Sequence, residues 1–178
     1  GAGAVMVAGR SPAKLALAQR FGADLVLGAG DDVLSAVRDT TEGVGVDVVI
    51  ETAGGPPEAG LAGAATLDLA ARCVRRGGRI VVVSVLPDRV DAPLGILRGR
   101  SVALLHPRSG AGGYSPGASV FEYALRLVAR GDVDVESLVT HRLDGVDAIP
   151  EAVAITTDKA AHGAINPAQV VMSGQAPT

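Results

Sequence analysis

One stretch of the chain constrains its fold more than any other. From Ile80 to Val85 the sequence is Ile-Val-Val-Val-Ser-Val, so five of six side chains are apolar and β-branched. A strand without alternating polar positions has both faces buried, as in a parallel sheet with helices on its two sides. The Gly77-Gly78 pair just before it predicts a tight turn into the strand. The sequence therefore predicts an α/β fold.

Composition supports this class and excludes others. Aromatic residues make up only 2% of the chain and there is no Trp, so a core must be built from Val, Leu, Ile and Ala. A formal charge of −3 and an isoelectric point near 5.6 provide no basic face for nucleic acid. No apolar stretch suggests a membrane span, and the single cysteine, Cys73, excludes an internal disulfide. We expect a soluble, cytoplasmic protein that binds neither nucleic acid nor membranes.

Strand-length runs alternate with helical segments along the first part of the chain. In order, the predicted elements are strand 4–8, helix 12–21, strand 25–27, helix 33–41, strand 46–50, helix 57–74, strand 80–85 and strand 102–105. Ser11-Pro12 is a strong helix start, because serine caps free amides and proline fits the first turn. This order predicts a doubly wound, Rossmann-like parallel sheet.

The pattern changes after about Gly110. The sequence predicts a loop over 109–113 and a helix that starts at Pro116 or Ser119 and ends at Gly131. It then predicts an extended stretch over 138–140, a helix over 149–158, a last strand within 164–172 and a frayed tail from Gly174.

Four stretches, taken in order, resemble the zinc-type medium-chain dehydrogenase/reductase family of alcohol and polyol dehydrogenases. They are residues 10–24, 45–54, 76–84 and 138–152, which together extend over nearly the whole chain. The resemblance implies that residues 1–112 form a partial dinucleotide-binding domain. It also implies that residues 113–178 form C-terminal helices and a strand that pack on a catalytic domain outside this sequence.

The start of the chain departs from the family pattern. A dinucleotide fold begins with a strand, a glycine-rich turn close to the pyrophosphate, and a helix N-terminus. Gly1-Ala2-Gly3 imitates that turn, but no strand precedes it and a strand follows it. We therefore expect the family's first strand, first helix and N-terminal zinc domain to lie outside this chain. The missing strand is central in the order 3-2-1-4-5-6, so the chain alone should have two facing edges and marginal stability.

The end of the first predicted strand bears on cofactor choice. Folds that prefer NAD place an acidic residue there to bind the adenosine ribose, whereas this chain has Gly9, followed by Arg10, Ser11 and Lys14. Glycine leaves room for a 2′-phosphate, and arginine offers it a planar set of donors. This pattern favours NADP over NAD. The alternative is that Arg10 and Lys14 are solvated charges at a helix start.

Two further segments follow predicted strands at the sheet edge where such folds bind ligands. The resemblance places Thr52-Ala53-Gly54 beside the nicotinamide-proximal part of the cofactor. Val83-Ser84-Val85 ends the next strand, where its backbone could bind the carboxamide. The alternative for both is ordinary strand termination.

Other chemically active side chains have simpler explanations. Glu51 is expected to be structural, since nothing near it in sequence pairs with it, and Cys73 is expected to be a small buried residue. His106, His141 and His162 lack ligand-like spacing to another metal-binding residue. We predict no catalytic residue and no metal ligand in this chain.

The resemblance implies an oxidoreductase that transfers a hydride between NADP (or NAD) and an alcohol or carbonyl substrate. Zinc is expected only in the missing N-terminal domain, and the complete enzyme is expected to be a homo-oligomer. One alternative is a zinc-independent enoyl or quinone reductase of the same superfamily. A second is a non-catalytic nucleotide-binding module, and a third is an inert truncation. We expect this chain alone to be inactive.

Overall fold

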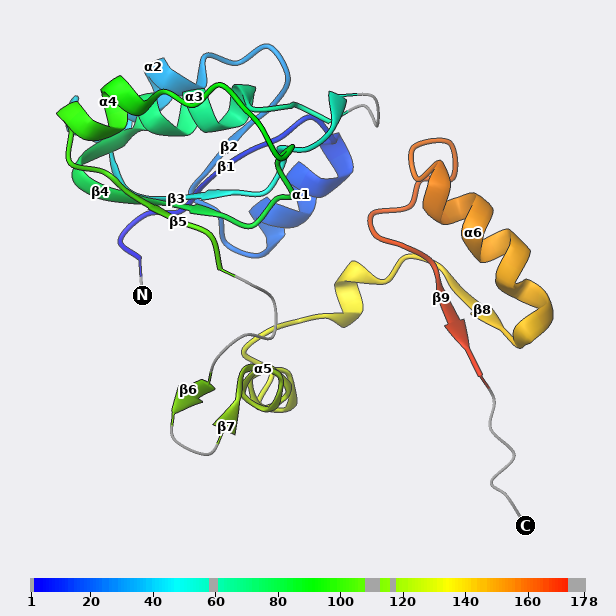
Figure 1. Ribbon diagram of the computed structural model, residues 1–178. Helices are drawn as coiled ribbons and strands as arrows, with labels where there is room; N and C mark the ends of the chain where they lie inside the picture. The colour runs from blue at the N-terminus through cyan, green and yellow to red at the C-terminus, as the bar shows by residue number, and fades with distance from the viewer. Residues whose placement is uncertain (1, 58–60, 108–112, 116–117, 173–178) are drawn as a thin grey trace. The chain divides into compact units, whose positions relative to one another are not determined.

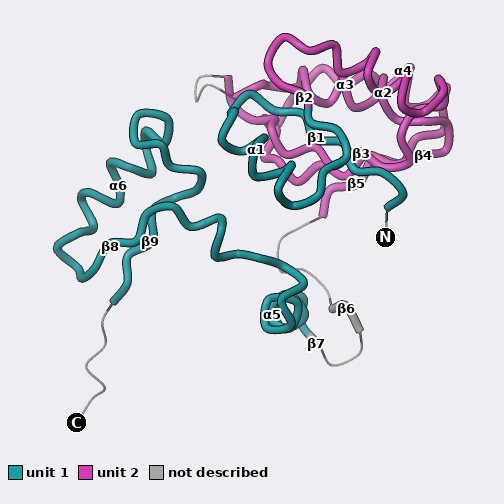
Figure 2. The backbone as a smooth tube through the Cα atoms, turned by 180° about the vertical axis from the view of Figure 1, so that it is seen from behind, with its two compact units in different colours: residues 1–26, 112–178 teal, residues 27–111 magenta. Residues whose placement is uncertain are grey.

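The computed structural model describes residues 2–57, 61–107, 113–115 and 118–172 (Figure 1). The chain divides into two compact units. Unit 1 contains residues 1–26 and 112–178, and unit 2 contains residues 27–111 (Figure 2). Each unit is described by itself. In the described part of the chain, no helix is long and apolar enough to cross a membrane.

Unit 2 is built on a parallel sheet. Its strands are β3 (Val46–Glu51), β4 (Val74–Val82) and β5 (Ala103–Leu105), in the order β3-β4-β5. Helices α2 (Val33–Thr40), α3 (Ala65–Cys73) and α4 (Leu94–Gly99) lie along one side of this sheet (Figure 1). The predicted α/β class with parallel strands is confirmed.

The core of unit 2 lies between this sheet and helices α3 and α4. Leu67 of α3 and Ile80 of β4 are almost completely buried, and burial of each such side chain stabilises the fold by about 2 kcal/mol. Ala70 and Ala71 are also buried, because small side chains let α3 approach the strands closely. Leu97 closes the cluster from α4. The core is aliphatic, as the composition predicts.

The opposite face of the sheet is not buried as predicted. Val49 packs against the core, but its neighbours Val48 and Ile50 are exposed, Ile50 by 64%. Leu105 of β5 is exposed as well. The expectation that uninterrupted apolar strands are buried on both faces is wrong for β3 and β5. Both are edge strands of a three-stranded sheet, and the helices of unit 2 lie on its other side.

Two predicted elements in unit 2 have different bounds. Gly55 and Gly63 exchange backbone hydrogen bonds, and α3 starts at Ala65 instead of residue 57. The strand predicted over 80–85 starts at Val74 and ends at Val82. Helix α4 was not predicted between the last two strands, because six residues are too few for a clear helical period.

The predicted Gly77-Gly78 turn lies within β4 as an irregularity of the strand. The register with β3 passes from Val46 opposite Val74 to Val48 opposite Arg79, so β4 contains extra residues at a bulge. Gly77 has a φ of 67°, which favours glycine. A Cβ on Gly78 would lie 2.6 Å from Val74 Cγ2 and 2.9 Å from the Asp47 carbonyl oxygen.

The first elements of the chain follow the sequence prediction. Strands β1 (Met6–Ala8) and β2 (Leu25–Leu27) form a two-stranded sheet and are joined through α1 (Pro12–Arg20). Ser11 caps α1, and Leu17 is its buried residue. The Asp24 carboxylate accepts a hydrogen bond of 2.7 Å from the Val5 amide, which helps to fix the start of β1.

The C-terminal part of unit 1 contains short elements. They are β6 (Gly113–Ser115), β7 (Ala118–Ser119), α5 (Val120–Ala129), two 3₁₀ turns η2 (Glu136–Leu138) and η3 (Val146–Ala148), β8 (Arg142–Asp144), α6 (Ile149–Thr157) and β9 (Gln169–Val171). Ser119 caps α5 as predicted, and β8 pairs with β9 in parallel. The extended stretch expected over 138–140 begins later, at Arg142. Pro116, residues 109–112 of the expected loop and the tail from Gly174 lie outside the described residues.

Candidate functional site

The carboxyl ends of β3 and β4 lie next to each other in the sheet of unit 2. Glu51, the last residue of β3, is opposite Val82, the last residue of β4. The amides of Val83 and Ser84 donate to the Glu51 carbonyl at 2.8 and 3.2 Å. Residues 52–54 and 83–85 therefore leave the sheet side by side, at the edge where parallel α/β sheets bind ligands.

The side chain of Glu51 organises this edge. It is only 4% exposed, and its Oε1 accepts hydrogen bonds from the amides of Ala53 at 2.8 Å and Gly54 at 2.7 Å. The hydroxyl of Ser84 donates to Oε2. Burial acts to raise the pKa of Glu51, but these hydrogen bonds to the charged form outweigh it, and the pKa lies below its ordinary value. Glu51 is therefore an ionised carboxylate that fixes two neighbouring segments.

The predicted residues after β3 differ in their accessibility to a ligand. Thr52 and Ala53 are exposed, whereas Gly54 is buried. A Cβ on Gly54 would lie 2.5 Å from Leu86 Cδ2 and 2.9 Å from Ser84 Oγ. The packing of the protein itself therefore requires glycine at this position.

Two of the three predicted residues after β4 are largely exposed to solvent. Val83 and Val85 are 56% and 81% exposed, which is unusual for valine beside a buried strand. The Ser84 hydroxyl is directed to Glu51. The amides of Val83 and Ser84 are also engaged, so the carbonyl oxygens of these residues are the groups left to accept a hydrogen bond from a ligand.

The other four predicted residues belong to unit 1. Gly9 directly follows β1, and a Cβ there would make a tight contact of 3.3 Å with Leu15 Cδ2. The side chains of Arg10 and Lys14 are exposed. The Ser11 hydroxyl accepts from the Lys14 amide at 3.5 Å and so acts as the helix cap. Two cationic side chains at a helix N-terminus suit an anionic group.

Sequence reasoning missed the contact between Glu51 and Ser84. The two residues are 33 positions apart, and no local pattern links them. The expected structural role of Glu51 is supported by its contacts, although its partners include a residue far away in sequence. Cys73 is buried, as expected, and burial raises the pKa of its thiol.

The described residues contain no group of three or more His, Cys, Asp or Glu side chains placed to hold a metal ion. His106 is exposed at the end of unit 2's last strand, and His141 Nδ1 lies 3.0 Å from its neighbour Thr140 Oγ1.

Comparison with known proteins identifies the family. The protein-family model described as zinc-binding dehydrogenase matches residues 1–130 of the chain. The chain belongs to the zinc-binding dehydrogenase family. The resemblance predicted from the sequence is thereby confirmed.

Relatives with known names extend the comparison. It is 32% identical over 139 residues to the zinc-type alcohol dehydrogenase-like protein YdjJ of Escherichia coli, covering 74% of this chain and 33% of the relative. It is 30% identical over 143 residues to sorbitol dehydrogenase of Bacillus subtilis, covering 79% and 36%. Alcohol dehydrogenase TADH from Thermus sp. ATN1 superposes with a TM-score of 0.75 at 26% identity, covering 97% of this chain and 44% of that one. The chain thus spans less than half the length of these proteins.

Proposed function

We propose that this chain is the cofactor-binding portion of an NAD(P)-dependent oxidoreductase that transfers a hydride between nicotinamide and an alcohol or carbonyl substrate. The observation that carries this proposal is the edge formed by the ends of β3 and β4, where ionised Glu51 fixes residues 52–54 and 83–85 next to each other. Relatives named sorbitol dehydrogenase and L-threonine 3-dehydrogenase, at 30% and 28% identity, support it.

Residues of this chain would bind and orient the cofactor. The bound nicotinamide supplies the hydride chemistry. The carbonyl oxygens of Val83 and Ser84 would accept hydrogen bonds from its carboxamide, and the exposed valines 83 and 85 would offer its ring an apolar surface. Thr52, Ala53 and Gly54 would border the same region. We assign no catalytic residue and no zinc ligand to this chain.

The segment after β1 favours NADP. A 2′-phosphate would meet Gly9, which has no side chain to oppose it, together with the cationic side chains of Arg10 and Lys14 and the capped helix end at Ser11. Two relatives named NADP-dependent isopropanol dehydrogenase support this choice, from Entamoeba histolytica at 29% identity and from Clostridium beijerinckii at 30%.

The sheets also suggest how the complete domain is assembled. Among the described strands, β1 and β2 form one sheet and β3, β4 and β5 form another. Loss of the central strand from the order 3-2-1-4-5-6 would leave these two sets. We therefore propose that a strand from outside this sequence joins them. Residues 1–112 would then belong to the dinucleotide-binding domain, and residues 113–178 would pack on the catalytic domain.

Isothermal titration with NADPH and NADH tests the proposal, using this chain joined to the family's N-terminal region. We expect NADPH to bind about tenfold more tightly than NADH, because the 2′-phosphate adds charge-assisted hydrogen bonds. Arg10→Asp should remove this preference. Arg20→Asp makes the same charge change at the other end of α1 and should leave the preference intact.

Two results would count against the proposal. Equal affinity for the two cofactors, unchanged by Arg10→Asp, would defeat the 2′-phosphate assignment. Failure to bind either cofactor would defeat the oxidoreductase assignment.

A further inference from the structure

A pocket lined by five arginines lies at the other end of the unit 2 sheet. Its volume is about 540 Å³, and its charged lining consists of Arg38, Arg72, Arg75, Arg76 and Arg100. The last turns of α2 and α3 and the amino ends of β3 and β4 form its wall. Strand β3 has six residues, so roughly 17 Å of extended chain separate this pocket from Glu51.

Carboxylates balance only part of this charge. Arg72 pairs with Asp68 at 2.7 Å, and Arg75 pairs with Asp47 at 2.6 Å. Among the described residues, Arg38, Arg76 and Arg100 form no ion pair with a carboxylate. Three of the five arginines that line the pocket thus have no ion-paired carboxylate among the described residues.

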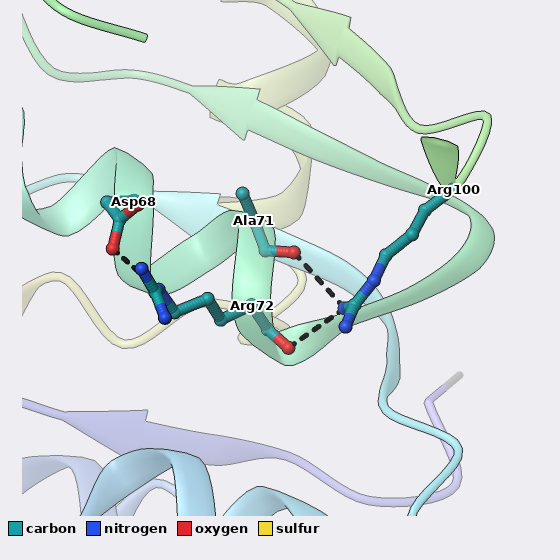
Figure 3. A network of polar contacts seen from close by, with 4 residues as sticks. All are labelled: Asp68, Ala71, Arg72 and Arg100. Carbon is teal, nitrogen blue, oxygen red and sulfur yellow. Dashed lines mark hydrogen bonds and ion pairs between the residues drawn. The ribbon is translucent and has the colours of Figure 1, made fainter. Parts of the chain in front are cut away.

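Some of the arginines are held in place by the backbone. The Arg100 guanidinium donates to the carbonyl oxygens of Ala71 and Arg72 at the end of α3 (Figure 3) and to that of Val74. Arg75 is fixed by Asp47 and by the carbonyl of Arg76. These two guanidinium groups are thus ordered before any ligand arrives, which lowers the entropic cost of binding.

Helix ends explain part of the cluster but not all of it. A basic residue in the last turn of a helix interacts favourably with the partial negative charge there, and Arg38 and Arg72 occupy such turns in α2 and α3. One arginine at each helix end would fill that role. Arg76 lies beyond α3 on the bulge of β4, and its guanidinium donates a hydrogen bond to the Gly99 carbonyl at 3.2 Å.

We infer that this pocket binds a small molecule that carries more than one phosphate group. Its volume falls within the range of about 300–1,000 Å³ that is usual for small-molecule sites. Guanidinium groups present planar pairs of donors that match phosphate oxygens. Arg75 and Arg100 are held in place by their hydrogen bonds, and the exposed Arg38 and Arg76 add two further guanidinium groups to the lining.

Isothermal titration of the chain with inorganic pyrophosphate tests this inference, with orthophosphate and citrate as comparisons. We expect pyrophosphate to bind more tightly than either. The double variant Arg38→Ala/Arg76→Ala should weaken its binding about tenfold, because each lost charge-assisted contact at an exposed site is worth roughly threefold. Neither side chain supports the core, so circular dichroism should show an unchanged fold.

A matched control distinguishes specific binding in the pocket from nonspecific electrostatic attraction of anions to the chain. Arg20→Ala/Arg89→Ala removes the same charge from two exposed positions that do not line the pocket and should leave the affinity within about twofold. Arg10→Asp, at the proposed 2′-phosphate position, should also leave pyrophosphate binding unchanged.

Three results would overturn the inference. They are absence of pyrophosphate binding at millimolar concentration, equal weakening by the control double variant, and citrate binding as tight as pyrophosphate binding.

Discussion

The Ser84 hydroxyl donates to the Glu51 carboxylate across the ends of two neighbouring parallel strands. The same carboxylate accepts the amides of Ala53 and Gly54, so a single buried charge ties together two segments that are far apart in sequence. Since the charge is satisfied entirely by hydrogen bonds from its surroundings, the stability of this edge depends on the ionised form of Glu51.

Glu51→Gln tests the importance of this charge. The amide keeps one acceptor oxygen but puts an NH₂ group where Ser84 needs an acceptor, so we expect a loss of about 1–3 kcal/mol in the free energy of unfolding. Urea denaturation measures it. Ser84→Ala removes one donor only and should cost less. Equal stability of Glu51→Gln and the unchanged chain would contradict the assigned role.

The lowered pKa of Glu51 predicts loss of stability in acid. Because the folded pKa lies below the unfolded one, the unfolded state takes up the proton first as the pH falls. The contribution of Glu51 is therefore complete above the unfolded pKa of about 4.3 and is lost as the pH falls through the folded pKa.

The measurement is urea denaturation at several pH values between 7 and 3. Asp47 also has a lowered pKa, because of its hydrogen bond from Arg75, so Glu51→Gln should reduce the acid dependence without abolishing it. An unchanged pH profile in Glu51→Gln would show that Glu51 titrates at its ordinary pKa.

Gly54→Ala tests the packing behind the candidate site. The added methyl would lie 2.5 Å from Leu86 Cδ2 and 2.9 Å from Ser84 Oγ, so the loop must shift. We expect a loss of about 1–3 kcal/mol in thermal unfolding. Gly95→Ala, in α4, has open space around the new Cβ and should stabilise the chain by up to about 1 kcal/mol. Similar changes in stability for the two variants would show that the structure has room for a side chain at residue 54.

Adjacent residues of β3 provide a test of the exposed sheet face. Ile50→Thr should change stability by less than about 0.5 kcal/mol, because Ile50 is largely exposed, and should reduce binding of a hydrophobic dye. Val49→Thr places a hydroxyl against the core and should cost about 1–2 kcal/mol. Dye fluorescence and urea denaturation measure the two effects. A larger loss of stability in Ile50→Thr than in Val49→Thr would mean that Ile50, and not Val49, faces the core.

Local signals predicted the elements whose determinants are local. Ser11, Asp32 and Ser119 each cap a helix that starts at the next residue, and in each the side-chain oxygen accepts an amide three residues on. The start of α3 was misplaced, because the bridge between Gly55 and Gly63 is a contact that helical periodicity does not reveal.

The candidate site could be predicted only in outline. The strand ends at Gly9 and Thr52 follow from apolar runs, whereas the run over 80–85 extends past the end of β4 at Val82. The relation of these strand ends to a ligand depends on the assembled sheet. Neither the link from Glu51 to Ser84 nor the arginine pocket has a sequence signature, because each joins residues from separate elements. The cofactor-binding roles of the ten predicted residues remain predictions.

The hydrogen bond from Arg100 to the end of α3 bears on the order in which the chain folds during synthesis. The Arg100 guanidinium satisfies the carbonyl of Arg72, which precedes it by 28 residues. A nascent chain therefore exposes the end of α3 well before the side chain that completes it leaves the ribosome. We expect this helix end to gain protection from hydrogen exchange only after residue 100 has emerged, and early protection in shorter stalled chains would refute this order of folding.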